Sequence, residues 1–241
     1  EVRDPIATST GAVTKDGTGT GSLRPSAVNS YTGATNVNNG TLLIDFPNAT
    51  PTTNIISASS VLNLGGGTLS LLGKAATTNS QTFASTGLTA GSYTAVSVDQ
   101  QSATSLTLAL GTLTRNANSG VNFDLANSPI VTLTLGASLS NASGIITATS
   151  TGAAVATYNK TDWATLSGSN PAAYSGYVDN TFTTGTNTNV VSFGGNGSSF
   201  TTNTLRFILE PTERAVWPAF TPGLYFPVPP SSFPRPDLLH C

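Results

Sequence analysis

The sequence predicts an all-β protein, and the internal similarity of its segments favours a parallel β-solenoid within that class. Three observations support this prediction. Short apolar runs alternate with polar residues, clusters of glycine and asparagine separate the runs, and a Leu-x-Leu motif recurs along the chain. Alternation with a period of two is typical of strands that bury one face. Glycine and asparagine tolerate the positive φ that tight turns require.

The alternating runs give the expected strands in chain order. They lie at 42–44, 68–71, 106–110, 121–125, 131–135, 190–193 and 205–207. Turn-forming clusters lie between them at 38–40, 65–67, 90–92, 118–120, 143–144 and 194–197. Good helix formers are scarce, so at most one short helical turn is expected, at 162–166.

Short strands joined by glycine turns fit a sandwich, a barrel or a solenoid. The Leu-x-Leu motifs that begin at Leu69, Leu106 and Leu133 favour the solenoid. Stacked coils place similar residues above one another while the loops between strands vary in length. Asn and Thr suit the outside of such a stack, because identical side chains can hydrogen-bond from coil to coil.

The composition excludes several functional classes. Thr, Ser, Asn and Gly account for 40, 28, 20 and 24 of the 241 residues, whereas Lys and Arg together number 9 and Asp and Glu 11. Without a basic excess, no nucleic-acid partner is expected. The single Cys241 cannot form an internal disulfide, and with the single His240 it cannot build a thiol-protease or zinc site. The chain has no run of 18 apolar residues, so we expect no transmembrane segment.

The composition changes after Ile208. Residues 210–241 hold 8 of the 14 prolines. Proline cannot donate a hydrogen bond to a sheet, so this segment cannot continue the stack. We therefore expect a β-solenoid region at 1–209 and a Pro-rich, poorly ordered tail at 210–241.

One segment resembles a known family. Residues 31–42 read Tyr-Thr-Gly-x-Thr-x-Val-x-x-Gly-Thr-Leu, within a longer stretch at 11–46, and this is similar to the autotransporter-associated β-strand repeat, or passenger-associated transport repeat, of bacterial surface proteins. Arg24-Pro25 departs from the family's pattern. Weaker blocks that resemble the segments between such repeats extend the likeness over about residues 3–207; they lie at 67–71, 73–74, 80–83, 108–111, 114–116, 161–164 and 203–207.

The resemblance implies a right-handed β-solenoid passenger region, with one repeat at 3–46 and a longer module at 61–207. It also implies a protein that is secreted or held at the cell surface, associated with the outer membrane through a part outside this chain. The sequence leaves open whether the repeat at 3–46 stacks on the module at 61–207.

A group of aromatic residues is the main candidate binding site. Tyr158, Trp163, Tyr174 and Tyr177 lie close together in sequence, and aromatic faces can stack on sugars. The alternative interpretation is packing, with Trp163 covering the hydrophobic core and donating its N–H to a loop carbonyl. Surface glycans or other surface proteins are the partners that this candidate site would suit.

We expect no catalytic residues, no metal site and no cofactor. Solenoid enzymes that cleave polysaccharides use clustered carboxylates, and the nearest arrangement is Asp99 and Asp124 with Arg115 between them. Isolated acids that keep the surface soluble are the simpler interpretation. The glycine cluster at 194–198 lacks the aspartate of a calcium-binding turn.

Three functions follow in order of preference. The first is a structural segment, a rigid stalk or scaffold of an exported bacterial protein. The second is a carbohydrate-binding adhesin module that uses the aromatic group. The third is a polysaccharide-degrading solenoid enzyme, which the small number of acids argues against.

Overall fold

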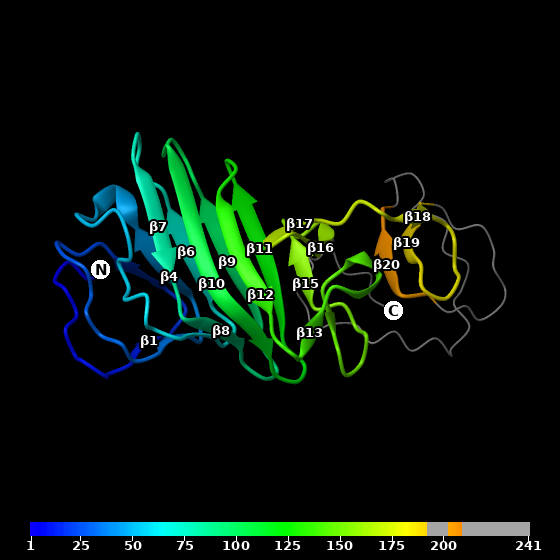
Figure 1. Ribbon diagram of the computed structural model, residues 1–241, viewed down its shortest axis with the longest axis horizontal. Helices are drawn as coiled ribbons and strands as arrows, with labels where there is room; N and C mark the ends of the chain where they lie inside the picture. Colours follow the sequence, from blue (N-terminus) through cyan, green and yellow to red (C-terminus); the bar gives the residue numbers. More distant parts are fainter. Residues whose placement is uncertain (192–201, 209–241) are drawn as a thin grey trace, which may run out of the picture. The chain divides into compact units, whose positions relative to one another are not determined.

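The computed structural model describes residues 1–191 and 202–208. The expected tail at 210–241 and the glycine cluster at 194–198 lie outside the described residues. The chain divides into two compact units, Glu1–Ser175 and Gly176–Cys241. Nearly all regular structure is β (Figure 1), and the helical segments among the described residues are two short 3-10 turns, η1 (Phe46–Asn48) and η2 (Ala142–Gly144).

The first unit contains seventeen strands, β1 to β17. Their bounds are β1 Val13–Lys15, β2 Thr20–Leu23, β3 Thr35–Val37, β4 Thr41–Asp45, β5 Leu62–Leu64, β6 Thr68–Leu72, β7 Thr78–Thr82, β8 Ser85–Leu88, β9 Tyr93–Asp99, β10 Ser105–Arg115, β11 Gly120–Ala126, β12 Ile130–Leu135, β13 Leu139–Ser140, β14 Thr147–Ala148, β15 Ala156–Tyr158, β16 Asp162–Ser167 and β17 Asn170–Ala173.

Most of these strands form two parallel sheets, which confirms the predicted parallel solenoid. One sheet has the order β2-β4-β6-β9-β11-β15, and the other has the order β1-β3-β5-β8-β10-β12. Strands that neighbour each other in a sheet are separated in the chain by a strand of the other sheet, so the chain winds between the sheets. β7 pairs with the first half of β10 and belongs to the second of these sheets. Figure 1 shows the strands side by side along the stack.

The register gives the length of one coil. In the first sheet Thr41 pairs with Thr68, Thr68 with Ala95, and Ala95 with Asn122, so that each of these coils is 27 residues long. The step before them is shorter, since Thr20 pairs with Thr41. The pairs β3–β5 and β4–β6 also answer the question left open by the sequence: residues 35–45 stack directly on residues 62–72.

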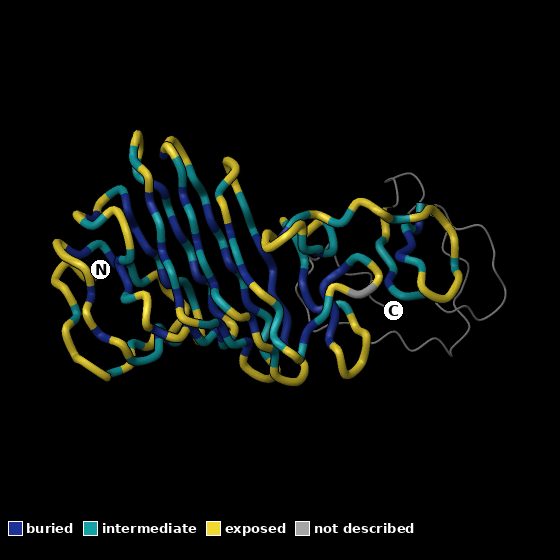
Figure 2. Tube along the Cα trace, in the orientation of Figure 1, coloured by how far each residue is buried: buried dark blue, intermediate teal, exposed yellow. Residues whose placement is uncertain are grey.

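Inward side chains form continuous columns through the stack. Alternating burial in β6 and β9 is the structural counterpart of the period-two pattern (Figure 2). Because the strands are parallel and in register, equivalent inward residues lie directly above one another. Two columns in the first sheet are Leu23-Ile44-Leu71-Val98-Leu125 and Leu42-Leu69-Val96-Phe123-Tyr158.

Two expectations need correction. Leu69 stacks on Leu42 and Val96 in one sheet, whereas Leu106 and Leu133 lie on β10 and β12 of the other. The motifs of β10 and β12 are in paired strands but out of step, with Leu108 opposite Val131, so the three Leu-x-Leu motifs do not form one column. The segment 162–166, where a short helical turn was the most that seemed possible, belongs to strand β16. Its pairing partners on both sides hold it extended.

The parallel stack ends at β15. This strand pairs with β11 over three residues and then turns back into β16, which pairs antiparallel with β15 and with β17. The reversal occurs at Asn159 and Lys160, whose φ values are 48° and 61°. Positive φ at both central residues defines a type I′ turn, which favours a tight antiparallel hairpin.

The second unit has a small sheet of its own. Its strands β18 (Val178–Asp179), β19 (Asn187–Val190) and β20 (Thr204–Phe207) are parallel, in that order. Amide and hydroxyl groups join the strands, since Asn187 Oδ1 accepts hydrogen bonds from Asn203 Nδ2 at 2.7 Å and Thr204 Oγ1 at 2.9 Å.

Candidate functional site

The Tyr-Thr-Gly-x-Thr segment forms a buried hydroxyl network at a corner of the coil. The Tyr31 hydroxyl lies 2.9 Å from Thr35 Oγ1, which lies 2.9 Å from Ser60 Oγ in the next coil. Ser60 Oγ donates to the Gly33 carbonyl at 2.7 Å. Burial raises the pKa of the Tyr31 phenol, and its bond to Thr35 acts in the opposite direction. The motif therefore ties two neighbouring coils together through satisfied polar groups in an apolar interior.

The two glycines of the same segment allow close backbone contact with the preceding coil. A Cβ atom on Gly33 would lie 2.3 Å from the Gly11 carbonyl oxygen. Gly40 has a φ of 63°, and a Cβ there would lie 2.3 Å from the Gly19 carbonyl oxygen. Only glycine fits at both positions without displacing the backbone of the preceding coil.

Buried amide side chains take the place of strand pairing beside segments that form no regular strand. Gln81 accepts from Ile56 N at 3.0 Å and donates to Ile56 O at 2.9 Å, as a neighbouring strand would. Asn29 accepts from Ile6 N at 2.6 Å and donates to Ile55 O at 2.7 Å, so it bridges two coils. Both side chains are fully buried. Sequence reasoning missed them, because the segments Ser80-Gln81-Thr82 and Val28-Asn29-Ser30 show no apolar alternation that would mark a buried amide.

The structure brings three of the four candidate aromatic residues into one unit. Tyr158 ends an inward column and packs against the core cluster. Trp163 is half-buried on β16, opposite Thr157, and its carbonyl accepts from Tyr174 N at 2.8 Å. The ring of Tyr174 lies against Gly144, where a Cβ atom would be 2.7 Å from Cε2.

Tyr177 belongs to the second unit. The Arg206 guanidinium lies over its ring, with Cζ 4.8 Å from the ring centroid. This distance is that of a cation–π contact, which already covers one face of the ring.

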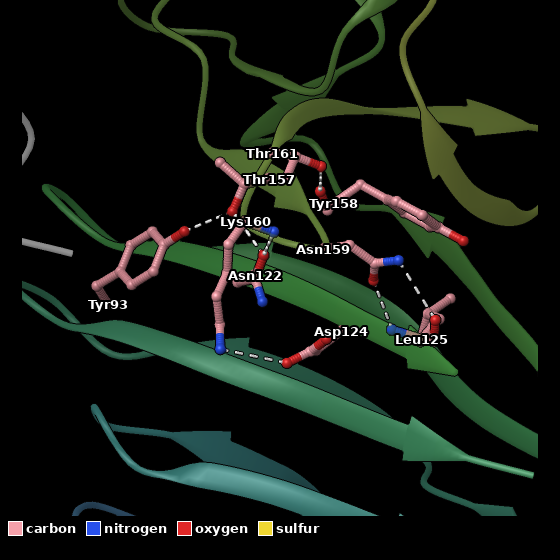
Figure 3. Close-up of polar contacts among 9 residues, drawn as sticks. All are labelled: Tyr93, Asn122, Asp124, Leu125, Thr157, Tyr158, Asn159, Lys160 and Thr161. Atoms are coloured by element: carbon pink, nitrogen blue, oxygen red, sulfur yellow. Dashed lines mark hydrogen bonds and ion pairs between the residues drawn. The ribbon is translucent and has the colours of Figure 1, made fainter. Parts of the chain in front are cut away.

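The hairpin turn at the end of the stack presents a group of polar contacts (Figure 3). Asn159 brackets Leu125 of β11, accepting from its N–H at 2.8 Å and donating to its carbonyl at 3.4 Å. Asn122 Oδ1 accepts from Thr157 Oγ1 at 2.9 Å and from Lys160 N at 3.0 Å. Lys160 Nζ lies 3.4 Å from Asp124 Oδ2.

The acids weighed as catalytic candidates have local partners. Asp99 Oδ1 accepts from Gln101 N at 2.8 Å and from Asn127 Nδ2 at 2.7 Å, whereas Asp124 faces Lys160. Arg115 Nε donates to the Ser119 carbonyl at 2.8 Å. Across residues 1–191 and 202–208, His, Cys, Asp and Glu form no group of three that could hold a metal ion.

Within the part of the chain that is described, no helix has both the length and the apolar character needed to cross a bilayer.

Comparison with known proteins finds similarity over short parts of the chain. Residues 13–44 match the family described as passenger-associated-transport-repeat. Over 62 residues the chain is 45% identical to the Adhesin BmaC autotransporter of Brucella suis biovar 1 (strain 1330), an alignment that covers 25% of this chain and 2% of that protein. No solved structure matches. The matched residues run from β1 to β4 and include Tyr31, Gly33 and Gly40, so residues 13–44 form a passenger-associated transport repeat, folded here within the stacked coils of a parallel β-solenoid.

Proposed function

We propose that this chain is a structural segment of an exported bacterial surface protein, acting as a rigid β-solenoid stalk or scaffold. One observation supports the proposal above the others: strand pairs stay parallel and in register through successive coils, with continuous inward columns. Each coil then contacts only its neighbours, so length grows by adding coils. The passenger-associated transport repeat and the autotransporter relative support export to the cell surface.

A non-catalytic role is part of this proposal. Asp99 and Asp124 are each engaged by neighbouring side chains, and the core columns are apolar. These contacts support a surface role for the acids.

Coil duplication tests the scaffold role. Thr68 pairs with Ala95, so a copy of residues 68–94 inserted after Thr94 preserves the register. Four copies should lengthen the solenoid by about 19 Å, at about 4.8 Å for each coil, because parallel strands stack at that spacing. Small-angle X-ray scattering of the full chain with and without the insertion measures the increase.

A matched insertion of the same four copies, each shortened by three residues, serves as the control. The shortened copies break the register and should unfold or aggregate. If the in-register copies gave no increase in the longest dimension while remaining folded, the additive scaffold would be wrong.

A second candidate is a carbohydrate-binding module, favoured by the adhesin name of the relative and by the position of Tyr158, Trp163 and Tyr174 in one unit. Trp163→Ala should abolish binding on a glycan array while the β-sheet circular dichroism spectrum is unchanged. Phe207→Ala, on β20, removes an exposed aromatic ring outside this group and serves as the control. Equal glycan binding by the Trp163→Ala variant and the parent chain would exclude this use of the aromatic group.

A further inference from the structure

A buried donor lies on β11 without an acceptor. Asn122 is 1% exposed, and its Oδ1 accepts the two hydrogen bonds from Thr157 and Lys160 described above. Its Nδ2 atom is buried and has no hydrogen-bond partner. Leaving a buried amide N–H unpaired is unfavourable, so this position favours any group that brings an acceptor.

The Lys160 side chain, which passes this donor, is held weakly. Figure 3 shows Lys160 running past Asn122 to reach Asp124. The Lys160 and Asp124 side chains are 61% and 41% exposed, and their charged atoms are 3.4 Å apart. An ion pair this exposed contributes little, because water and salt screen both charges. Lys160 can therefore swing into solvent while its backbone N–H keeps its bond to Asn122.

We propose that Asn122, Asp124 and Tyr93 form a binding site for a neutral pyranose sugar, covered by Lys160 when it is empty. One sugar hydroxyl accepts a hydrogen bond from Asn122 Nδ2 and donates to the Asp124 carboxylate. The ring of the sugar lies beside the half-buried Tyr93, whose hydroxyl is fixed 2.5 Å from Thr157 Oγ1. Aromatic rings pack well against the apolar faces of sugars.

Charge selects the class of sugar. Besides Lys160, Asp124 is the charged side chain among the residues drawn in Figure 3, and it disfavours an anionic ligand once Lys160 has moved away. A hydroxyl both donates and accepts, which is what an amide N–H next to a carboxylate requires. This site uses none of Trp163, Tyr174 or Tyr177, and it does not depend on the scaffold role.

Nuclear magnetic resonance of the full chain tests the site directly. The 15N-labelled protein is titrated with the methyl β-pyranosides of glucose, galactose and mannose, and with methyl glucuronide. We expect the Asn122 side-chain amide signals to shift with at least one neutral glycoside and methyl glucuronide to bind more weakly. Lys160→Ala should tighten the binding of the neutral glycoside about two- to fivefold, because the competing ion pair is removed. Asp124→Ala should weaken it.

Lys74→Ala is the matched control, because Lys74 Nζ donates to the Ala49 carbonyl at 3.1 Å in another part of the stack. The Lys74→Ala variant should bind the neutral glycoside with the same affinity as the parent chain. Thermal melts report whether each variant is folded. Unmoved Asn122 signals in both the parent and the folded Lys160→Ala variant, with all three neutral glycosides, would overturn the proposal. Tighter binding of the glucuronide than of the glucoside would do the same. Either result leaves the coil-duplication and Trp163 tests unaffected.

Discussion

At the scale of single residues, the repeat motif is explained by what each side chain touches. Tyr31 and Thr35 are fully buried and carry hydroxyl groups to the same network, whereas Gly33 and Gly40 have no room for a Cβ atom. Each residue type thus has a separate physical reason. The hydroxyl network also contains Tyr31, whose titration affects the stability of the fold.

Tyr31 should make the fold sensitive to alkaline pH. Its folded-state pKa is raised by burial above the usual value near 10. The unfolded chain therefore loses the Tyr31 proton first, so the stability is fully present below pH 10 and is lost as the pH rises through the folded pKa. Urea unfolding at pH 8 and pH 11 measures the loss.

The matched variant is Tyr31→Phe, which retains the Thr35–Ser60 contact. It should lose less stability than the parent between the two pH values, although it is less stable at pH 8 by about 1 kcal/mol for the lost hydrogen bond. An identical decrease in the two proteins would show that Tyr31 does not titrate on unfolding.

At the scale of secondary-structure elements, two glycines in strands of the second sheet have opposite roles. Gly87 on β8 lies between Asn63 and Thr114 on neighbouring coils, and a Cβ atom there would be 3.4 Å from Asn63 Oδ1 and 3.7 Å from Thr114 Oγ1. Gly111 divides β10 with a φ of 62°, and a Cβ there would be 2.5 Å from the Ala84 carbonyl oxygen.

Replacement by alanine should therefore change stability in opposite directions. Gly87→Ala should raise the free energy of unfolding by about 0.5–1 kcal/mol, because glycine inside a strand loses more backbone entropy on folding. Gly111→Ala should lower it by about 1–3 kcal/mol, because of strain and the backbone contact. Chemical denaturation of both variants measures the difference. A loss of stability in Gly87→Ala would contradict this account of the strand.

The elements also show how far the sequence predicts the structure. Alternation predicts β6 and β11, because their inward residues Leu69, Leu71 and Phe123 each meet an apolar residue in the adjoining coil, but it does not predict β9 between them. The Leu-x-Leu spacing does not predict which strands stack, because Leu69 and Leu106 serve different faces. The role of Gln81 is also hidden, since its partner Ile56 lies in a segment without regular strands. Likewise, nothing local distinguishes the donor of Asn122 from that of any other strand asparagine.

At the scale of the whole first unit, apolar columns and amide bonds hold the coils together, and charges contribute little. The ion pairs of Glu1 with Arg3 and Arg24, and of Lys160 with Asp124, involve side chains that are 28% to 75% exposed. Pairs of this kind are screened by salt. Interior hydrogen bonds such as that from Asn29 to Ile55 are not screened by salt.

Stability should therefore be nearly independent of ionic strength. Between 0.05 and 1 M NaCl we expect the free energy of unfolding to change by less than about 1 kcal/mol. Urea titrations at the two salt concentrations measure it, and the Lys160→Ala variant reports the share of its ion pair. A fall of several kcal/mol at high salt would show that charged contacts matter far more than this account allows.

Gly33 and Gly40, which carry no Cβ atom, determine what kind of structure must precede them in the chain. Each Cα atom lies against carbonyl oxygens of residues 10 to 19 in the preceding coil, and it would lose these contacts if that coil were missing. The two glycines of the motif thus form an interface whose other side consists of backbone atoms alone. In a longer polypeptide that repeats this motif, each copy requires a complete coil immediately before it, whatever side chains that coil carries.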